Sequence, residues 1–132
     1  MKIVSGFDEK TIDFIAKNCG AKSVKSAANY IRVPFIGGAG FVCEIIDGTC
    51  FFAGTKCKKH FRLYEMAVLE SEQKKGYGTA MIYRIKKICA DSGLKKITLR
   101  TSKEESAINF YRKFNCKIIG EKDGDWEVEI PV

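Results

Sequence analysis

The chain has 132 residues, 45% of them hydrophobic, which is enough for one domain with a single sizeable core. No apolar run approaches the roughly 18 to 20 residues that a membrane-spanning helix needs, and the start "MKIVSGFDEK" lacks a signal-peptide apolar segment, so a cytoplasmic location and no membrane partner are expected. Lysine and arginine outnumber acidic residues 23 to 16, a net charge of +7 that indicates an anionic partner such as nucleic acid, an acidic membrane or a phosphorylated cofactor.

The N-terminal part is expected to hold one strand and two helices. "KIVSGF" is short and apolar and predicts an opening strand. Asp8 can cap a first helix, and Ser23 can cap a shorter one whose apolar residues repeat at helical spacing as far as Ile31. The stretch "VPFIGGAG" that follows is typical of a loop.

The middle of the chain changes to the periodicity of strands. "FVCEII" and "CFFAG" are separated by Asp47-Gly48, a dipeptide that favours the tight turn of a β-hairpin. The second of these strands is expected to extend through "KCKKHF". A third strand, "RLYEMAVLE", completes a run that can form an antiparallel meander.

Helices and strands alternate in the C-terminal part. An apolar stripe that starts at Met81 predicts an amphipathic helix ending at Gly93, and the strand "KKITLR" follows it. A second helix is expected over residues 104–114. Two last strands, "CKIIGE" and "WEVEIPV", flank the turn "KDGD". Because there is no repeat, low-complexity tract or linker, residues 1–132 are predicted to form one mixed α+β domain.

Two glycines lie where the first of these C-terminal helices begins, in "QKKGYG" at residues 73–78. Unpaired amides at a helix start, together with the helix dipole, form an anion site, and a glycine lets a phosphate approach closely. Neither Gly76 nor Gly78 is followed by the lysine and hydroxyl residue of a P-loop, and Met81 stands where a dinucleotide fingerprint needs a third glycine. On the glycines alone, it is an equally good interpretation that Gly76 is a plain turn residue and that Gly78 allows helix and sheet to pack closely.

The stretch "QKKGYG" resembles the Q/R-x-x-G-x-G/A signature of the GNAT superfamily, the acetyl-CoA-dependent N-acetyltransferases. "YEMAVLES" is similar to the family's fourth strand, and "SAINFYRKFNCKII" is similar to its later helix with A-x-x-F-Y-x-K. The order of the predicted elements is also that of the family. The sequence departs from the usual pattern at Lys75, where arginine is usual, and at Asn115-Cys116, where Gly-Phe is usual. The resemblance implies a single-domain GNAT-like fold, with a central, mixed but mostly antiparallel sheet flanked by helices.

The same resemblance implies acetyl-CoA as cosubstrate. Backbone amides of Met66, Ala67 and Val68 would lie beside its pantetheine arm and thioester carbonyl, where one of them can act as an oxyanion donor. Asn109 matches a position that often contacts the cofactor, although a solvated polar face is an equally good reading. The pyrophosphate would be held by amides of the tract that comprises Gln73, Lys74, Lys75, Gly76, Tyr77, Gly78 and Thr79.

Two residues are our candidates for proton transfer. An amine with a pKa near 10.4 is protonated all but about one part in a thousand at neutral pH, so a base is useful. Glu65 is the acid nearest the presumed carbonyl, although strand alternation places Tyr64 and Met66 on one side and Glu65 on the other; Glu44 is a second candidate. Tyr111 matches a family tyrosine that can protonate the leaving thiolate, and its alternative role is helix packing.

No metal site is predicted. The six cysteines are scattered and are interpreted as reduced thiols. Cys57 and His60 in "CKKH" have half of a zinc-ligand spacing, and no second close pair completes it.

These patterns predict an N-acetyltransferase that passes acetyl from acetyl-CoA directly to a primary amine of a small molecule or a protein. The alternative from another class is a non-catalytic acyl-CoA-binding or regulatory module on the same fold. A nucleic-acid-binding domain would use "KCKKHFR", but the lysines are spread over the whole chain, so nucleic acid is not expected as a partner. A homodimer is a further possibility, because dimers are frequent in the family and the terminal strands offer an interface.

Overall fold

Seven strands form one sheet in the computed structural model of the chain, which describes residues 3–5 and 40–132. The helices expected after Asp8 and after Ser23 lie outside these described residues. The strands are β1 (Ile3–Ser5), β2 (Phe41–Ile46), β3 (Cys50–Lys56), β4 (Phe61–Val68), β5 (Lys96–Thr101), β6 (Lys117–Lys122) and β7 (Asp125–Pro131). Their order in the sheet is β1-β2-β3-β4-β5-β7-β6, and every neighbouring pair is antiparallel except β4 and β5. The predicted α+β class with a mixed, mostly antiparallel sheet is confirmed.

Tight turns join the strands of the two predicted hairpins. Asp47 and Gly48 both have positive φ, 52° and 65°, and the Thr49 amide donates to the Ile46 carbonyl at 3.0 Å. Asp123 and Gly124 form the corresponding turn between β6 and β7, with φ of 52° and 83°. Both dipeptides therefore adopt the left-handed backbone that this kind of hairpin turn requires.

One strand is shorter than predicted. β3 ends at Lys56, so its expected extension through "KCKKHF" is wrong. The Cys57 amide instead donates to the His60 carbonyl at 2.8 Å, and this bond closes a turn that leads directly into β4. Lys58 and Lys59 are exposed at the tip of that turn, where water solvates their ammonium groups.

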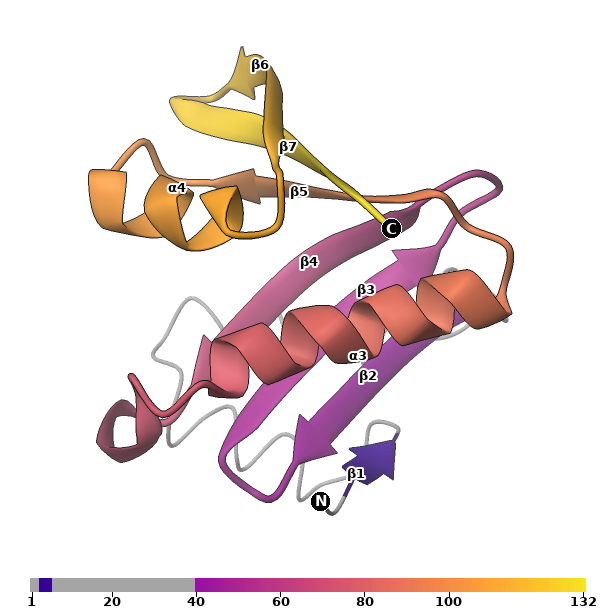
Figure 1. Ribbon diagram of the computed structural model, residues 1–132, viewed down its shortest axis with the longest axis vertical. Coiled ribbons are helices and arrows are strands. Elements are labelled where there is room, and N and C mark those ends of the chain that lie inside the picture. Colours follow the sequence, from indigo (N-terminus) through magenta and orange to yellow (C-terminus); the bar gives the residue numbers. More distant parts are fainter. Residues whose placement is uncertain (1–2, 6–39) are drawn as a thin grey trace.

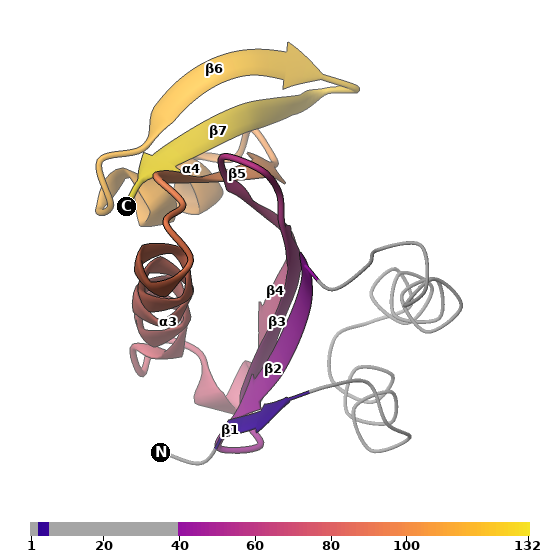
Figure 2. The ribbon, with the colours of Figure 1, turned by 90° about the vertical axis from the view of Figure 1, so that its right-hand side faces the viewer.

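The helix α3 (Tyr77–Asp91) lies across one face of the sheet (Figures 1 and 2). It ends as predicted, since Gly93 has φ 73° and the Leu94 amide donates back to the Cys89 carbonyl at 2.8 Å. Its apolar stripe packs on strand residues that include Phe52 and Phe61, and together they form the main core. The fully buried residues of the stripe are Met81, Ile82, Ile85 and Cys89.

A buried ion pair joins α3 to β2. The Glu44 carboxylate, 2% exposed, accepts two hydrogen bonds from Nε of Arg84, at 2.8 and 3.1 Å. This contact raises the pKa of Arg84. Glu44, the second candidate base, is therefore held against α3 by a guanidinium.

A β-bulge in β4 changes which side chains face which side of the sheet. Glu65 is opposite Ala53 and Leu63 is opposite Gly54, so Tyr64 is the extra residue. The bulge shifts the alternation by one, which leaves both Leu63 and Met66 on the face that α3 covers. The expectation that Tyr64 and Met66 share a side is wrong, because Tyr64 lines the same cavity as Glu65.

β4 and β5 separate soon after they meet. Their ladder consists of Phe61 opposite Ile97 and Arg62 opposite Thr98, after which the strands diverge (Figure 1). β5 continues alongside β7, and the helix α4 (Glu105–Arg112) follows it. The sheet is thus split open between β4 and β5.

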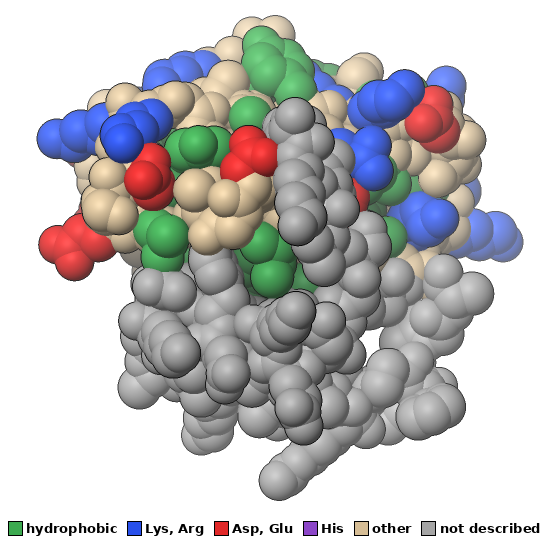
Figure 3. Space-filling model, turned by 90° about the horizontal axis from the view of Figure 1, so that it is seen from below, with side chains coloured by type: hydrophobic (Ala, Val, Ile, Leu, Met, Phe, Trp, Pro, Cys, Tyr) green, Lys and Arg blue, Asp and Glu red, His purple; other side chains and the backbone are tan. Residues whose placement is uncertain are grey.

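No helix of the described residues is long and apolar enough to cross a membrane. Seen from below, lysine and arginine side chains are dispersed over the described surface with acidic ones among them (Figure 3).

Candidate active site

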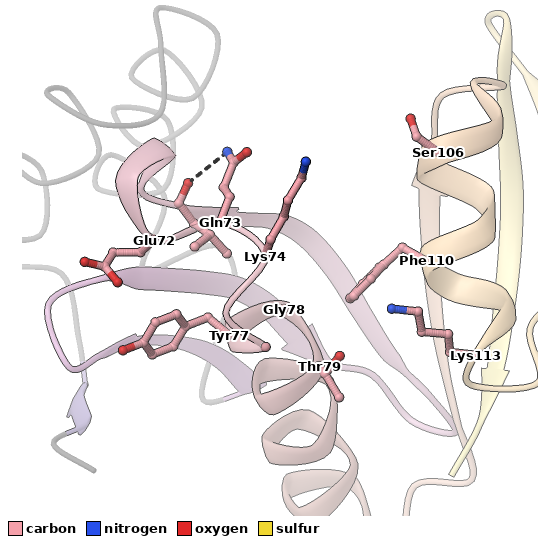
Figure 4. A pocket seen from close by; sticks show the side chains of 11 residues that line it. Glu72, Gln73, Lys74, Tyr77, Gly78, Thr79, Ser106, Phe110 and Lys113 are labelled. Atoms are coloured by element: carbon pink, nitrogen blue, oxygen red, sulfur yellow. Dashed lines mark hydrogen bonds between the residues drawn. The ribbon is translucent and has the colours of Figure 1, made fainter.

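A cavity of about 710 Å³ lies between the start of α3 and α4 (Figure 4). We call it the α3 cavity. Most of its lining comes from the glycine-containing tract that links β4 to α3, and the rest comes from one side of α4. The lining residues are Val68, Glu72, Gln73, Lys74, Gly76, Tyr77, Gly78, Thr79, Ser106, Phe110 and Lys113.

The backbone of the linking tract leaves the start of α3 open. Gly76 is the N-cap residue with φ 89°, and Lys74 also has a left-handed φ of 65°. No side chain caps the helix. The amides of the first turn therefore have no partner within the helix, and the positive end of the helix dipole faces the cavity.

The absence of a side chain at Gly78 matters both for packing and for access to the first turn of α3. A Cβ built on Gly78 would lie 3.0 Å from the Phe110 ring, which is tighter than ordinary van der Waals contact. The alternative expected close packing of helix and sheet, but the close contact at Gly78 is with Phe110 of α4. The missing side chain also keeps the first turn of α3 accessible.

Two lysines supply positive charge from opposite walls of the α3 cavity. Lys74 extends from the linking tract, and Lys113 extends from the end of α4, with its Nζ 5.5 Å from the centre of the Phe110 ring (Figure 4). Lys75 does not line the cavity, and its exposed ammonium pairs with the Glu72 carboxylate at 3.0 Å. That pair is neutral, so Lys74 and Lys113 determine the charge of the cavity.

The α4 wall was missed in the sequence, although a signal was present. Ser106, Phe110 and Lys113 are spaced i, i+4 and i+7, which places them on one side of a helix. The resemblance drew attention to Asn109 and Tyr111 on the same helix instead.

Other predicted cofactor contacts lie in several environments. Val68 lines the α3 cavity, and its carbonyl accepts a hydrogen bond from the side-chain Nε2 of Gln73 at 3.4 Å (Figure 4). Met66 is partly buried against the core, whereas Ala67 points to the opposite face of the sheet. Asn109 is exposed and accepts a hydrogen bond from Arg112 at 2.7 Å, outside the lining of this cavity.

Tyr111 lies on the inner side of α4, partly buried against the core. Its ring meets that of Phe110 edge to face, with centroids 5.1 Å apart. Burial raises the pKa of the Tyr111 hydroxyl to about 12, so it is protonated at neutral pH. It does not belong to the lining of the α3 cavity.

A second cavity, of about 370 Å³, is lined by strand residues beside the opening between β4 and β5. Glu65 points to the face of the sheet opposite α3, because its ladder partner Ala53 does so. We call this the Glu65 cavity. Its lining residues are Tyr64, Glu65, Arg100, Thr101, Ser102 and Asp125.

The guanidinium in the Glu65 cavity is surrounded by acids. Arg100 lies 3.4 Å from the Asp125 carboxylate, 3.7 Å from that of Asp123 and 3.9 Å from that of Glu127. Arg62 binds Glu127 as well, at 2.9 Å, and this contact lowers the pKa of Glu127. The guanidinium of Arg100 is therefore already paired with carboxylates.

Neither a metal-ligand cluster nor a disulfide occurs in the described part of the chain. No group of three or more His, Cys, Asp and Glu side chains there could hold a metal ion. The five cysteines of that part are free thiols. Burial raises the pKa of Cys43 to about 12 and that of Cys89 to about 11, so these two thiols are poor nucleophiles at neutral pH.

Comparison with known proteins gives a family and a fold. The model of the Acetyltransferase (GNAT) family matches residues 36–115. A search of curated proteins found no match.

Solved structures match over nearly the whole chain. Ard1 from Thermoplasma volcanium superposes with a TM-score of 0.76 at 18% identity, covering 100% of this chain and 99% of that one. The PaiA N-acetyltransferase from Thermoplasma acidophilum, solved in complex with coenzyme A, gives 0.70 at 14% identity and covers 100% of both chains. The ribosomal-protein-S18-alanine N-acetyltransferase from Escherichia coli gives 0.75 at 14%, covering 99% of this chain and 94% of that one.

Proposed function

Because the chain belongs to the Acetyltransferase (GNAT) family, as the resemblance of "QKKGYG" predicted, we propose that it transfers acetyl from acetyl-CoA to a primary amine. The observation that carries this proposal is the α3 cavity. It combines an uncapped helix start, a glycine that leaves this start accessible and lysines on two walls. This combination suits a long, multiply phosphorylated ligand.

The residues present fit coenzyme A chemically. Amides of the first turn of α3, at Tyr77 to Thr79, would hold the pyrophosphate, since their N–H groups have no helical partner. Lys74 and Lys113 would neutralise phosphate charge from the two sides. Lys75 would contribute little, because Glu72 already neutralises it.

Acetyl-CoA supplies an activated thioester, from which the acetyl carbon forms a bond to the amine nitrogen while the carbon–sulfur bond breaks. The amine must lose a proton before or during attack, and the departing thiolate must gain one. Glu65, on the opposite face of the sheet, would accept the proton from the amine. Tyr111 would donate a proton to the thiolate. Because its pKa is about 12, its hydroxyl is protonated at neutral pH, as this role requires.

A free-thiol assay with a panel of primary amines tests the proposal. Purified full-length chain is mixed with acetyl-CoA, thiol release is followed with and without each amine, and acetyl-CoA binding is measured separately by calorimetry. We expect binding and amine-dependent release. Binding without turnover on any amine would support the non-catalytic acyl-CoA module instead, and absence of binding would contradict both functions.

A further inference from the structure

We propose that the Glu65 cavity binds the acceptor, and that the acceptor is a small aliphatic diamine or polyamine, recognised through its second ammonium group. This inference rests on the proposed acetyltransferase function and adds the chemical class of the amine.

The position of the cavity fits an acceptor. β4 contributes to both cavities, with Val68 in the α3 cavity and the bulge residues Tyr64 and Glu65 in the other. The two cavities lie beside the same opening, where β4 and β5 stop pairing after Arg62. The proposal therefore places the acyl group and the amine on either side of this opening.

The charge around the Glu65 cavity is opposite to that of the chain. The charged residues that line it are Glu65, Asp125 and Arg100, so two carboxylates face one guanidinium. The whole chain, in contrast, carries +7. Among the described residues Glu65 has no ion-pair partner, so its carboxylate is available to an ammonium group.

The occupied guanidinium disfavours an acceptor with a carboxylate. Arg100 already lies within 4 Å of three carboxylates, and its Nη2 also donates to the Lys122 carbonyl at 3.2 Å. A free amino acid would have to displace these acids to place its own carboxylate there. A second ammonium group would instead share the Asp125 carboxylate, which also lines the cavity and lies 3.4 Å from Arg100.

Size and long-range charge favour a small amine over a basic polypeptide. The cavity of about 370 Å³ suits a short flexible chain. The net charge of +7 would repel an extended polycation.

Each carboxylate then has a separate role in one balanced transfer. The reacting ammonium first gives one proton to Glu65, and the neutral nitrogen then bonds to the acetyl carbon and loses a second proton as the carbon–sulfur bond breaks. The thiolate that leaves takes up one proton, so one proton is released overall. The second ammonium stays charged beside Asp125 throughout. The product carries one positive charge fewer than the substrate. It should therefore bind the cavity more weakly, which favours its release.

A matched series of amines tests this class. 1,4-Diaminobutane, 1-aminobutane and 4-aminobutanoate share the reacting group and the chain length but end in a cation, a methyl group and an anion. Each is titrated by calorimetry into the full chain saturated with coenzyme A, and each is assayed with acetyl-CoA. We expect the diamine to bind about tenfold more tightly than the monoamine, and the amino acid to bind most weakly.

The variant Asp125→Asn tests whether the preference for the diamine depends on the Asp125 carboxylate. We expect it to reduce the preference for the diamine over the monoamine at least about fivefold, because it removes the carboxylate that pairs with the second ammonium. Asp91→Asn is the matched control: it makes the same change at the exposed end of α3 and should preserve the preference.

Equal or reversed binding of the three amines overturns the inference, whether or not any of them is acetylated. The same holds if Asp125→Asn leaves the preference intact. If the diamine binds as expected but no amine is turned over, the cavity assignment stands and the proposed enzymatic function fails.

Discussion

The two cavities beside the β4–β5 opening are built from different parts of the chain. The α3 cavity relies on backbone, namely a left-handed Gly76, a helix without a side-chain cap and the bare Cα of Gly78. The Glu65 cavity relies on side chains from β4, β5, β7 and the loop after β5. A backbone site survives most substitutions, whereas a side-chain site changes its chemistry with a single one.

This difference matters where sequences diverge while the fold is kept. Ard1 and the S18-alanine enzyme keep the fold at 18% and 14% identity to this chain. A cofactor site made of helix amides can persist through such divergence, because amides are present in every sequence. Acceptor specificity cannot persist in this way, because it depends on side chains. It has to be inferred separately for each sequence.

The largest effect is expected at Gly78. In Gly78→Val a branched side chain would collide with the Phe110 ring and cover the first turn of α3, so acetyl-CoA should bind about 100-fold more weakly. Calorimetry measures the affinity, and circular dichroism checks the fold. Gly120→Val is the control, since a Cβ there meets nothing within 4 Å. Equal affinities of the two variants would refute a cofactor site at the start of α3.

The next effect is expected at Tyr111. Tyr111→Phe keeps the packing but removes the hydroxyl, so kcat should fall about 10- to 100-fold with little change in either KM. An unchanged kcat would assign Tyr111 to packing alone.

The pH dependence of Tyr111 follows from its burial, which favours the neutral form and raises its pKa from 10.0 to about 12. Its contribution to stability is therefore complete below pH 10 and is lost as the pH rises toward 12. Ultraviolet titration of the phenolate, comparing wild type with Tyr111→Phe, should show one tyrosine that ionises later than the others. Ionisation of that tyrosine near pH 10 would contradict the buried environment.

The smallest effect on activity is expected from a change that touches neither cavity. Arg84→Met leaves the buried Glu44 carboxylate without its partner and should lower the free energy of unfolding by about 3 kcal/mol. Urea denaturation measures this loss, with Lys87→Met, from an exposed pair with Asp91, as the control. Both KM values should stay within about twofold of wild type at temperatures where the variant is folded. A selective change in one KM would mean that this pair supports one cavity more than the other.

The sequence predicted most of the fold because its signals are local. Asp47-Gly48, the stripe from Met81 and the glycines at 76 and 78 each act within a few residues of their own position. The glycines also identified one wall of the α3 cavity. The pairing of Lys75 with Glu72 is equally local, at i and i+3, and could have been predicted from spacing.

What could not be predicted depends on pairing between distant segments. The bulge at Tyr64 is defined only against β3, so the side of the sheet that Glu65 faces was unknown from β4 alone. Arg100 and Asp125 join Glu65 because β5 separates from β4 and pairs with β7. No pattern along the chain connects these three positions.

The claim that donor and acceptor bind on opposite faces of the sheet is tested most directly by one crossed kinetic measurement. KM for acetyl-CoA and KM for the best amine are determined in Lys113→Gln and in Asp125→Asn. We expect the lysine variant to raise KM for acetyl-CoA about fivefold and leave that for the amine unchanged, and the aspartate variant to do the reverse. If each variant raises both values equally, or if the two effects are exchanged, the two-sided arrangement is wrong.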